Sequence, residues 1–145
     1  HEVVGVDLSP EMLEQARKKL TKSLRLSFRQ ADGTNLPFEA SSFDAASISL
    51  GLHDMPYEIE IKVLQEMKRV TRRDGKILIV DYSEPWRNYA AKFAHNFINL
   101  YETPMYKKFI EVGLKKLLSK VGLTVKCETN WWGIFQIAIV ENKKK

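Results

Sequence analysis

Two short apolar segments of this chain each end in an aspartate, and a helix signal follows the first of them. The first segment runs from Val3 to Asp7, and Ser9 and Pro10 then suit the N-cap and the first position of a helix. The second segment ends at Asp32. The two strands of such a strand-helix-strand unit are parallel. Open α/β sheets bind nucleotides at the carboxyl ends of their strands, so both carboxylates are predicted to line one crevice.

The rest of the chain continues to alternate between strand and helix patterns. Strands are predicted at 24–29, 43–50 and 76–82, and a helix is predicted at 59–70. The tail predicts two further strands, at 123–130 and 134–141, joined by a turn at 131–133. This order predicts a doubly wound, mostly parallel α/β sheet with helices on both faces. The direct hairpin in the tail requires one C-terminal strand to run antiparallel.

Local patterns also predict how the helices pack. The inward face of the first helix is predicted to hold Met12, Leu13, Ala16 and Leu20. A single later helix is predicted to end at Gly122 and to turn four apolar residues inward, namely Phe109, Val112, Leu117 and Val121.

Among the predicted strands, the alternating pattern of 24–29 indicates a half-exposed strand near a sheet edge. The apolar run at 76–82 is typical of a strand at the sheet centre, and Asp74 with Gly75 predicts a turn before it. Cys127 is predicted to be a buried and inert thiol.

Length and composition predict one domain, residues 1–145, with an ordinary globular balance of 44% hydrophobic and 28% charged residues. No apolar run approaches the roughly 20 residues that span a bilayer. The single cysteine excludes an internal disulfide, which favours a cytoplasmic protein. The net charge is +5, but basic residues are scattered and do not alternate with aromatic ones, which argues against nucleic-acid binding. Homo-oligomer formation stays open.

The segment 85–106 differs from a compact connection between a strand and a helix. Its large apolar residues repeat at helical spacing, as Trp86, Tyr89, Phe93, Phe97 and Leu100. We interpret the segment as an inserted helix above the strand ends, where it would act as a substrate lid. The alternative is that this stripe is ordinary helix core.

Four stretches of the chain form a recognisable series, namely Val4–Leu13, then Ala31–Gly33 with Leu36–Phe38 and Ser42–Asp44, then Ser49–His53, and finally Glu66–Val70 with Asp74–Ile79. In this order and spacing they resemble the class I S-adenosylmethionine-dependent methyltransferases, and specifically the small branch that includes the ubiquinone/menaquinone-biosynthesis enzymes. The resemblance is close from residue 3 to about residue 82 and extends to the tail in topology only. It implies a Rossmann-like methyltransferase fold that takes S-adenosylmethionine as cofactor and a small molecule as methyl acceptor.

The resemblance also implies roles for residues that bind the nucleoside of the cofactor. Asp7 would bind the ribose hydroxyls, and Leu8 and Met12 would pack on the adenine. Asp32 would accept a hydrogen bond from the adenine amino group, with Gly33 letting the backbone approach. Each position also has a structural interpretation, because Asp7 alone suits a helix cap, Asp32 suits a turn and Met12 suits a core.

Further roles fall on the strand that ends near residue 50. The backbone of Ser49 and Leu50 would face the methionine portion of the cofactor, and His53 is a candidate general base. A structural role for this histidine stays open, and no metal-ligand spacing is found. The family's glycine-rich first strand and turn have no counterpart in the sequence, so we expect that strand and its helix to be missing from the sheet.

Two other functions fit parts of the same pattern. An aspartate at the end of a second strand also suits the ribose of a nicotinamide cofactor, which would make the protein an oxidoreductase. No Tyr-x-x-x-Lys pair supports that chemistry, and Asp32 with Leu36-Pro37-Phe38 fits a methyltransferase better. The third alternative is a non-catalytic binding module that has kept the methyltransferase fold.

Overall fold

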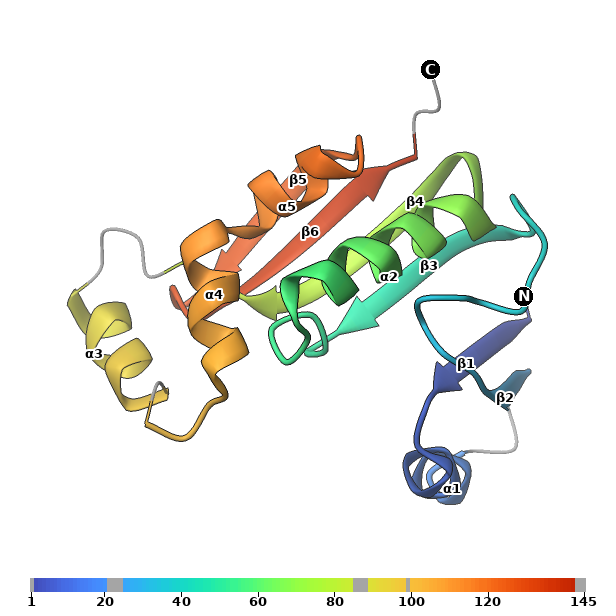
Figure 1. Ribbon diagram of the computed structural model, residues 1–145, viewed down its shortest axis with the longest axis horizontal. Helices are drawn as coiled ribbons and strands as arrows, with labels where there is room; N and C mark the ends of the chain where they lie inside the picture. The colour runs from blue at the N-terminus through green and yellow to red at the C-terminus, as the bar shows by residue number, and fades with distance from the viewer. Residues whose placement is uncertain (1, 21–24, 85–88, 99, 143–145) are drawn as a thin grey trace.

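The computed structural model describes residues 2–20, 25–84, 89–98 and 100–142. Strands and helices alternate in the first half of the chain, as the sequence predicts (Figure 1). The elements are β1 (Val3–Asp7), α1 (Pro10–Lys18), β2 (Leu26–Gln30), β3 (Phe43–Ser49), α2 (Tyr57–Val70), β4 (Thr71–Tyr82), α3 (Tyr89–Ile98), α4 (Pro104–Val112), α5 (Leu114–Lys120), β5 (Thr124–Trp131) and β6 (Phe135–Glu141). Among these, none is a helix with both the length and the apolar character that crossing a bilayer requires.

The strands form two separate sheets. β1 and β2 pair in parallel, and the second sheet has the order β3-β4-β6-β5. β3 and β4 are parallel, whereas β6 runs antiparallel to both of its neighbours, β4 and β5. The predicted antiparallel C-terminal strand is therefore confirmed, and so is the central position of the strand at 76–82. β2 lies at an edge, as its alternating pattern indicates.

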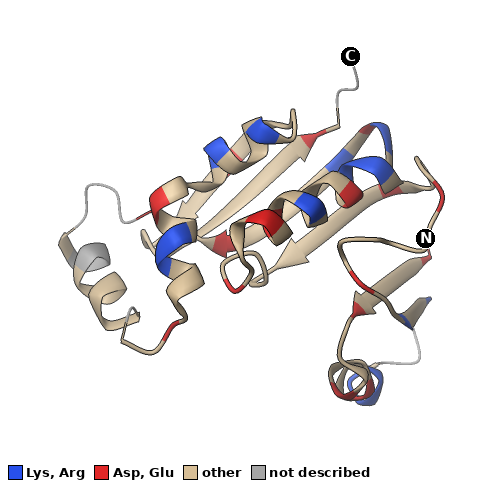
Figure 2. Ribbon diagram, viewed as in Figure 1, with Lys and Arg blue, Asp and Glu red and all other residues tan. Residues whose placement is uncertain are grey.

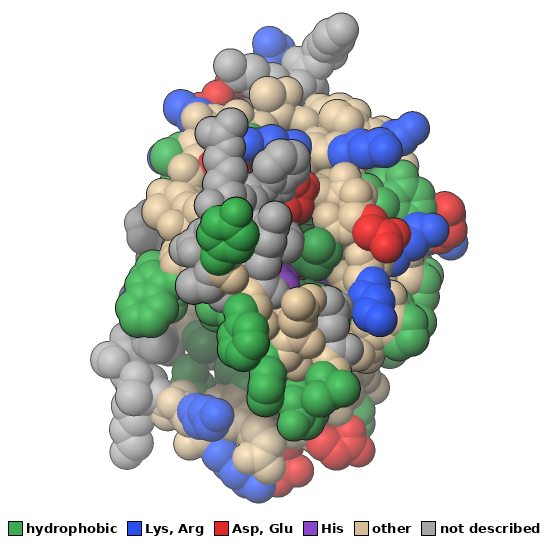
Figure 3. All heavy atoms as spheres, turned by 90° about the vertical axis from the view of Figure 1, so that its left-hand side faces the viewer, with side chains coloured by type: hydrophobic (Ala, Val, Ile, Leu, Met, Phe, Trp, Pro, Cys, Tyr) green, Lys and Arg blue, Asp and Glu red, His purple; other side chains and the backbone are tan. Residues whose placement is uncertain are grey.

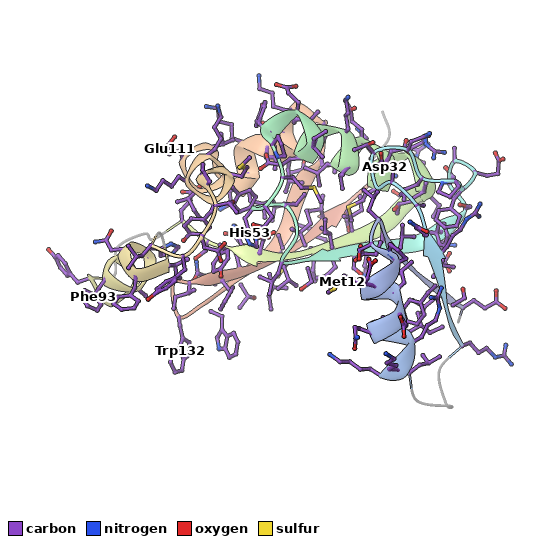
Figure 4. The ribbon with its side chains drawn as sticks, turned by 60° about the horizontal axis from the view of Figure 1, so that its bottom comes forward. Met12, Asp32, His53, Phe93, Glu111 and Trp132 are labelled. Carbon is purple, nitrogen blue, oxygen red and sulfur yellow. The ribbon has the colours of Figure 1, made fainter. Side chains whose placement is uncertain are left out.

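The main core lies on one face of the four-stranded sheet, under α2, α4 and α5 (Figures 1 and 4). Ile77 and Ile79 on β4 are fully buried on that face, whereas Leu78 between them is 38% exposed. On this four-stranded sheet the described helices thus cover one face only, while α1 packs against the separate β1-β2 sheet. The apolar run of β4 alternates in burial because helices pack on only one of its sides.

The first helix begins as the sequence predicts but packs differently. The Ser9 hydroxyl caps it by accepting a hydrogen bond from the Met12 backbone N–H at 3.1 Å. Leu13 is 3% exposed, but Met12 is 56% exposed and Leu20 lies beyond the end of the helix. The prediction that Met12 and Leu20 share an inward face is wrong, because α1 covers only the narrow β1-β2 sheet and has room to bury one large side chain there.

The helix predicted up to Gly122 is in fact two helices, α4 and α5, which meet at Gly113. Gly113 has φ +75°, a left-handed conformation that ends α4 and that favours glycine. A Cβ at this position would meet the Glu84 carboxylate at 1.9 Å, so no larger residue fits without rearrangement. Phe109 and Leu117 are both buried, which the sequence predicts correctly.

Two strand irregularities also correct the sequence-based expectations. Asp74 and Gly75 lie within β4 at a register shift against β3, where Asp74 has φ +61° and donates its N–H to the Asn142 carbonyl. The predicted turn is therefore a bulge. Cys127 is exposed rather than buried, because it follows a register shift in β5, which is an edge strand.

Candidate functional site

A cavity of about 1180 Å³ separates β1 from β3. It runs along both strands, whose facing edges are not paired with each other. Five of the predicted cofactor-binding residues line it, namely Asp7, Leu8, Gly33, Ser49 and Leu50. Its volume exceeds the roughly 300–1,000 Å³ of an ordinary ligand pocket, because it follows the whole length of the two strands as well as their carboxyl ends. Of the two carboxylates predicted to line one crevice, Asp7 lines this cavity and Asp32 does not.

Asp7 ends β1 at the rim of this cavity. Its Oδ1 accepts a hydrogen bond from the Ser9 backbone N–H at 2.9 Å, so it supports the start of α1. A carboxylate has four lone-pair sites on two oxygens, so this bond leaves Asp7 able to accept from a ligand hydroxyl. The capping role and the binding role are therefore compatible.

Asp32 follows β2 and forms a tight local turn. Its Oδ1 accepts from both the backbone N–H and the hydroxyl of Thr34, each at 2.8 Å. The backbone bond and then the side-chain bond from Thr34 lower the pKa of Asp32. The carboxylate is exposed and lies outside the cavity lining, whereas the adjacent Gly33 belongs to it. A Cβ on Gly33 would meet Val63 at an ordinary 3.5 Å, so the fold itself does not require glycine there.

Apolar side chains at the strand ends remain open to solvent. Leu8 is 64% exposed, Met12 is 56% exposed and Leu50 is 48% exposed. Leu8 and Leu50 line the cavity, while Met12 stands beside it on α1 (Figure 4). Exposed apolar side chains around one opening are suited to contact the flat face of a base.

His53 is held in a buried network just beyond β3. The ring is 4% exposed, and its Nδ1 lies 2.6 Å from Oδ1 of Asp81, which is fully buried at the end of β4. Asp81 also accepts from the backbone N–H groups of Tyr82 and Leu52, at 2.8 and 3.0 Å. An ionised carboxylate only accepts, so this arrangement assigns the proton to Nδ1 and leaves the lone pair on Nε2.

The Nε2 side of His53 faces two more carboxylates. Asp54 Oδ2 lies 3.5 Å from Nε2 and Glu102 Oε2 lies 4.0 Å from it. Burial lowers the pKa of His53, but the hydrogen bond and charge of Asp81 and the charges of Asp54 and Glu102 outweigh it, and the pKa is raised. The Tyr82 hydroxyl donates to Glu102 Oε1 at 3.0 Å, and burial followed by this bond raises the pKa of Tyr82 to about 12.

A small pocket of about 200 Å³ adjoins this network. It is lined by Tyr82, Phe97, Ile98, Tyr101 and Glu102. The Tyr82 ring also meets the His53 ring edge to face, with centroids 4.7 Å apart. Tyr82 and Glu102 therefore belong both to the pocket wall and to the surroundings of His53, and the pocket has the size of a single flat ring.

The segment 85–106 contributes part of this pocket wall. Its residues 85–88, with Trp86, and residue 99 lie outside the described part of the chain. α3 carries Tyr89, 90% exposed, and Phe93, 72% exposed, so these two rings do not belong to a core. Hydrophobic side chains gather at this end of the molecule, where Trp131 and Trp132 are exposed as well (Figure 3).

Sequence reasoning finds His53 but misses its partners. Asp81 carries the same signal as Asp7 and Asp32, because it follows the apolar run of a strand. Asp81 is thus the third aspartate, after Asp7 and Asp32, that stands at the carboxyl end of an apolar strand segment. Glu102 has no such signal, because it lies in a loop that only the fold brings to His53.

Lysine and arginine residues are distributed over α1, α2, α4 and α5, with acidic residues between them (Figure 2). The described surface therefore carries its positive charge in a dispersed form.

A family model for the methyltransferase domain matches residues 1–79, which include β1 to β3 and most of β4. The chain belongs to this methyltransferase family. A ubiquinone/menaquinone biosynthesis C-methyltransferase from Citrifermentans bemidjiense is 34% identical over 123 residues, which are 83% of this chain and 45% of that protein. A demethylmenaquinone methyltransferase from Clavibacter sepedonicus is 42% identical over 83 residues, which are 57% of this chain and 33% of that protein.

A solved structure of an S-adenosylmethionine-dependent methyltransferase from Aquifex aeolicus has the same fold. It matches with a TM-score of 0.67 and 20% identity, over 96% of this chain and 68% of that chain. The predicted family, the α/β methyltransferase fold and S-adenosylmethionine as the family's cofactor are thereby confirmed. The chain spans less than half the length of the two curated methyltransferases that it matches.

Proposed function

We propose that this protein transfers a methyl group from S-adenosylmethionine to a small hydroxylated aromatic ring. The observation that carries the proposal is the oriented His53–Asp81 pair, which adjoins a ring-sized pocket just beyond the strand whose end lines the cofactor cavity. S-adenosylmethionine supplies an electrophilic methyl group for in-line attack by the acceptor. Catalysis of such a transfer rests mainly on holding the two reactants close and aligned.

The residues around the cavity fit the nucleoside of this cofactor. Asp7 has acceptor sites left for a ribose diol, and Leu8 and Met12 offer exposed apolar surface for the adenine. Asp32 would accept from the adenine amino group through the oxygen that Thr34 does not occupy. The Ser49 and Leu50 backbone would face the methionine portion from the end of β3.

The acceptor would lie in the pocket beside Tyr82 and Glu102. The relatives named as demethylmenaquinone and ubiquinone/menaquinone methyltransferases support a quinol-type ring as its chemical class. In this arrangement Nε2 of His53 takes a proton from a ring hydroxyl, which makes the ring more nucleophilic, and Asp81 holds the imidazole in the required tautomer. α3 and the loop that follows it, which supply Phe97 and Tyr101, would form the lid over the acceptor.

We place this function in the cytoplasm, a location that the single cysteine supports. The low-molecular-weight acceptor is the only partner that the proposal requires.

Calorimetry with the full-length protein and S-adenosylhomocysteine tests the cofactor site. Asp7→Ala should weaken binding roughly ten- to hundredfold, because a hydrogen bond to a charged group contributes about 1.5–3 kcal/mol. Asp7→Asn should have a smaller effect, because it retains an acceptor for Ser9. Glu14→Ala is a matched control, since Glu14 is an exposed carboxylate on α1 that pairs with Lys18 at 2.9 Å. Equal affinity of wild type and a folded Asp7→Ala variant would contradict the assignment.

Steady-state kinetics with 1,4-dihydroxynaphthalene as acceptor test the base. His53→Gln should lower kcat by about 10²–10⁴ and leave the affinity for S-adenosylhomocysteine near normal. A variant with unchanged turnover would show that His53 has only a structural role. Tyr101→Ala should raise KM for the acceptor, because Tyr101 lines the pocket and is 78% exposed.

A further inference from the structure

We propose that His53, Asp54 and Glu102 form a binding site for one divalent first-row transition-metal ion such as Zn²⁺. The three side chains come from two distant segments, the loop after β3 and the loop before α4. One ligand atom from each of them lies within 4.8 Å of the other two. The inference does not depend on methyl transfer, because it concerns only the geometry and charge of these groups. A metal ion on Nε2 would occupy the lone pair that the proposed base uses, so the ion and the proton-accepting role exclude each other at any one time.

The separations of the ligand atoms suit a metal ion better than they suit hydrogen bonds. Nε2 of His53 is 3.5 Å from Asp54 and 4.0 Å from Glu102, both beyond the usual hydrogen-bond distance. Ligands that bind a tetrahedral metal at about 2.0–2.2 Å stand roughly 3.4 Å apart. The ligand atoms of Asp54 and Glu102 lie within 4.8 Å of each other, so shifts of up to about 1 Å in the two carboxylates would complete the geometry.

Two of the three ligands already have the outer partners that metal ligands use. Asp81 holds Nδ1 of His53, which fixes the ring and turns Nε2 toward the two carboxylates. Such carboxylate–histidine pairs recur behind metal ions, because the outer carboxylate raises the basicity of the ligand. Tyr82 plays the equivalent part for Glu102, since its hydroxyl donates to Oε1 and leaves Oε2 facing His53.

The charge of the cluster also favours a cation. Asp54, Asp81 and Glu102 bring three carboxylates around one imidazole, and within the described part of the chain their ion pairs are all with His53. No lysine or arginine among these residues is paired with any of the three. A dication at Nε2 would offset an excess of negative charge that the ion pairs of the described residues do not balance.

The site is accessible and has room for a further ligand. The Asp54 side chain is 52% exposed and Glu102 is 24% exposed, so an ion can enter from solvent. Glu102 also lines the ring-sized pocket, so the open coordination position would face that pocket. One nitrogen and two carboxylate oxygens suit Zn²⁺ and its first-row neighbours better than they suit Ca²⁺.

Titration calorimetry of the untagged full-length protein with Zn²⁺ tests the proposal, and Co²⁺ absorption reports the geometry. The wild type should bind about one equivalent, and Asp54→Asn and Glu102→Gln should each weaken binding at least tenfold. Asp44→Asn is the matched control, because this aspartate is 70% exposed and pairs with Arg72 instead. Its affinity for Zn²⁺ should equal that of the wild type.

Two results would overturn the proposal. One is the absence of Zn²⁺ binding by the wild type at millimolar metal. The other is unchanged affinity in Asp54→Asn and Glu102→Gln, with native circular dichroism, which would assign the ion to another place such as Cys127 or a chain terminus. Because calorimetry with metal alone requires neither cofactor nor acceptor, failure here leaves the proposed methyl transfer intact, and failure of methyl transfer leaves the metal site intact.

Discussion

The β1-α1-β2 unit and the four-stranded unit that follows it differ sharply in how much they bury. In the first unit, Leu13 is the one hydrophobic residue that is fully buried among those described. In the second, residues of α2, α4, α5, β4 and β6 share one continuous core. Burial of apolar surface is the main stabilising contribution to folding. The second unit therefore has most of what an independent fold needs, and the first unit does not.

The two units meet through a cavity and a small set of polar contacts. β1 and β3 face each other across the cavity without pairing. Glu66 and Arg69 on α2 hold the loop at 36–38, which belongs to the first unit, by hydrogen bonds to its backbone. The proposed acceptor site thus lies on the well-packed unit, and most of the proposed nucleoside site lies on the weakly packed one. We expect the first unit to open at a lower free energy than the second.

The largest expected change in stability comes from a pair of matched leucine substitutions, one in the core of each unit. Leu118 is fully buried in the main core, so Leu118→Ala should destabilise it by about 3 kcal/mol. Leu13→Ala, a matched substitution at 3% exposure, should leave that transition nearly unchanged and speed amide exchange only in β1 and β2. Urea denaturation followed by tryptophan fluorescence reports the second unit, because all three tryptophans lie at or after residue 86.

A single transition that shifts equally for both variants would contradict the comparison. It would mean that the units unfold together and that contacts across the cavity couple them. Circular dichroism of each variant in the absence of urea serves as the control for correct folding.

Predictions from the sequence are most accurate where the structure depends on neighbouring residues. Ser9 and Pro10 predict the start of α1, and the apolar runs predict β1, β3 and β4, because caps and strand patterns act over a few residues. The exposure of Cys127 and Leu78 depends on what packs above a sheet, and no local pattern contains that information. The break between α4 and α5 could be predicted from the sequence, because Gly113 is a glycine inside a helical pattern.

In the candidate site too, features set by neighbouring residues are predictable from the sequence, and features set by distant contacts are not. The carboxylate of Asp7 and the histidine at 53 follow from their places at strand ends. The pairing of His53 with Asp81, 28 residues later, depends on the register that sets Ser49 beside Val80. Glu102 reaches the same cluster through a loop whose path is set by α3 and α4. Long-range positions of this kind come from packing and register rather than from spacing.

A smaller effect arises from a buried carboxylate in the well-packed unit. Glu60 on α2 is 1% exposed, and its Oε1 has no hydrogen-bond partner among the described residues. Burial, and then the charge of Asp81, raise its pKa to about 7, although Lys108 acts in the opposite direction. Between about pH 4.5 and pH 7 the folded state therefore holds a proton that the unfolded state has lost, so the free energy of unfolding falls as pH rises through this window.

Glu60→Gln should remove that dependence. At pH 8 we expect the variant to be about 2 kcal/mol more stable than the wild type, and at pH 4.5 we expect the two to be similar. Some dependence should remain, because His53 also has a raised pKa and its contribution is lost as pH rises through that value. Urea denaturation of wild type and variant at a series of pH values measures the Glu60 contribution and the dependence that remains. Parallel curves for wild type and variant would show that Glu60 does not titrate in this range.

The smallest effect on global stability is expected from the contact that joins the units. Arg69 donates to the carbonyls of Phe38 and Leu36 at 2.8 and 2.9 Å, and Glu66, which Arg69 also binds, accepts from the Leu36 N–H at 2.7 Å. The Arg69 side chain is 36% exposed, so solvent screens the interaction and Arg69→Ala should cost only about 1 kcal/mol.

The local effect of Arg69→Ala should be much larger than the global one. Without Arg69 the loop at 36–38 loses its fixed position against α2, so amide exchange of Leu36 should accelerate at least tenfold while Leu118 stays protected. Arg72→Ala is the control, because Arg72 is 61% exposed and pairs with Asp44 within the second unit. The loop at 36–38 connects Asp32 and Gly33 to β3. Loss of its fixed position should therefore lower the affinity for S-adenosylhomocysteine in Arg69→Ala but not in Arg72→Ala. Unchanged exchange at Leu36 would show that the cavity walls, rather than this polar contact, set the position of the β1-α1-β2 unit.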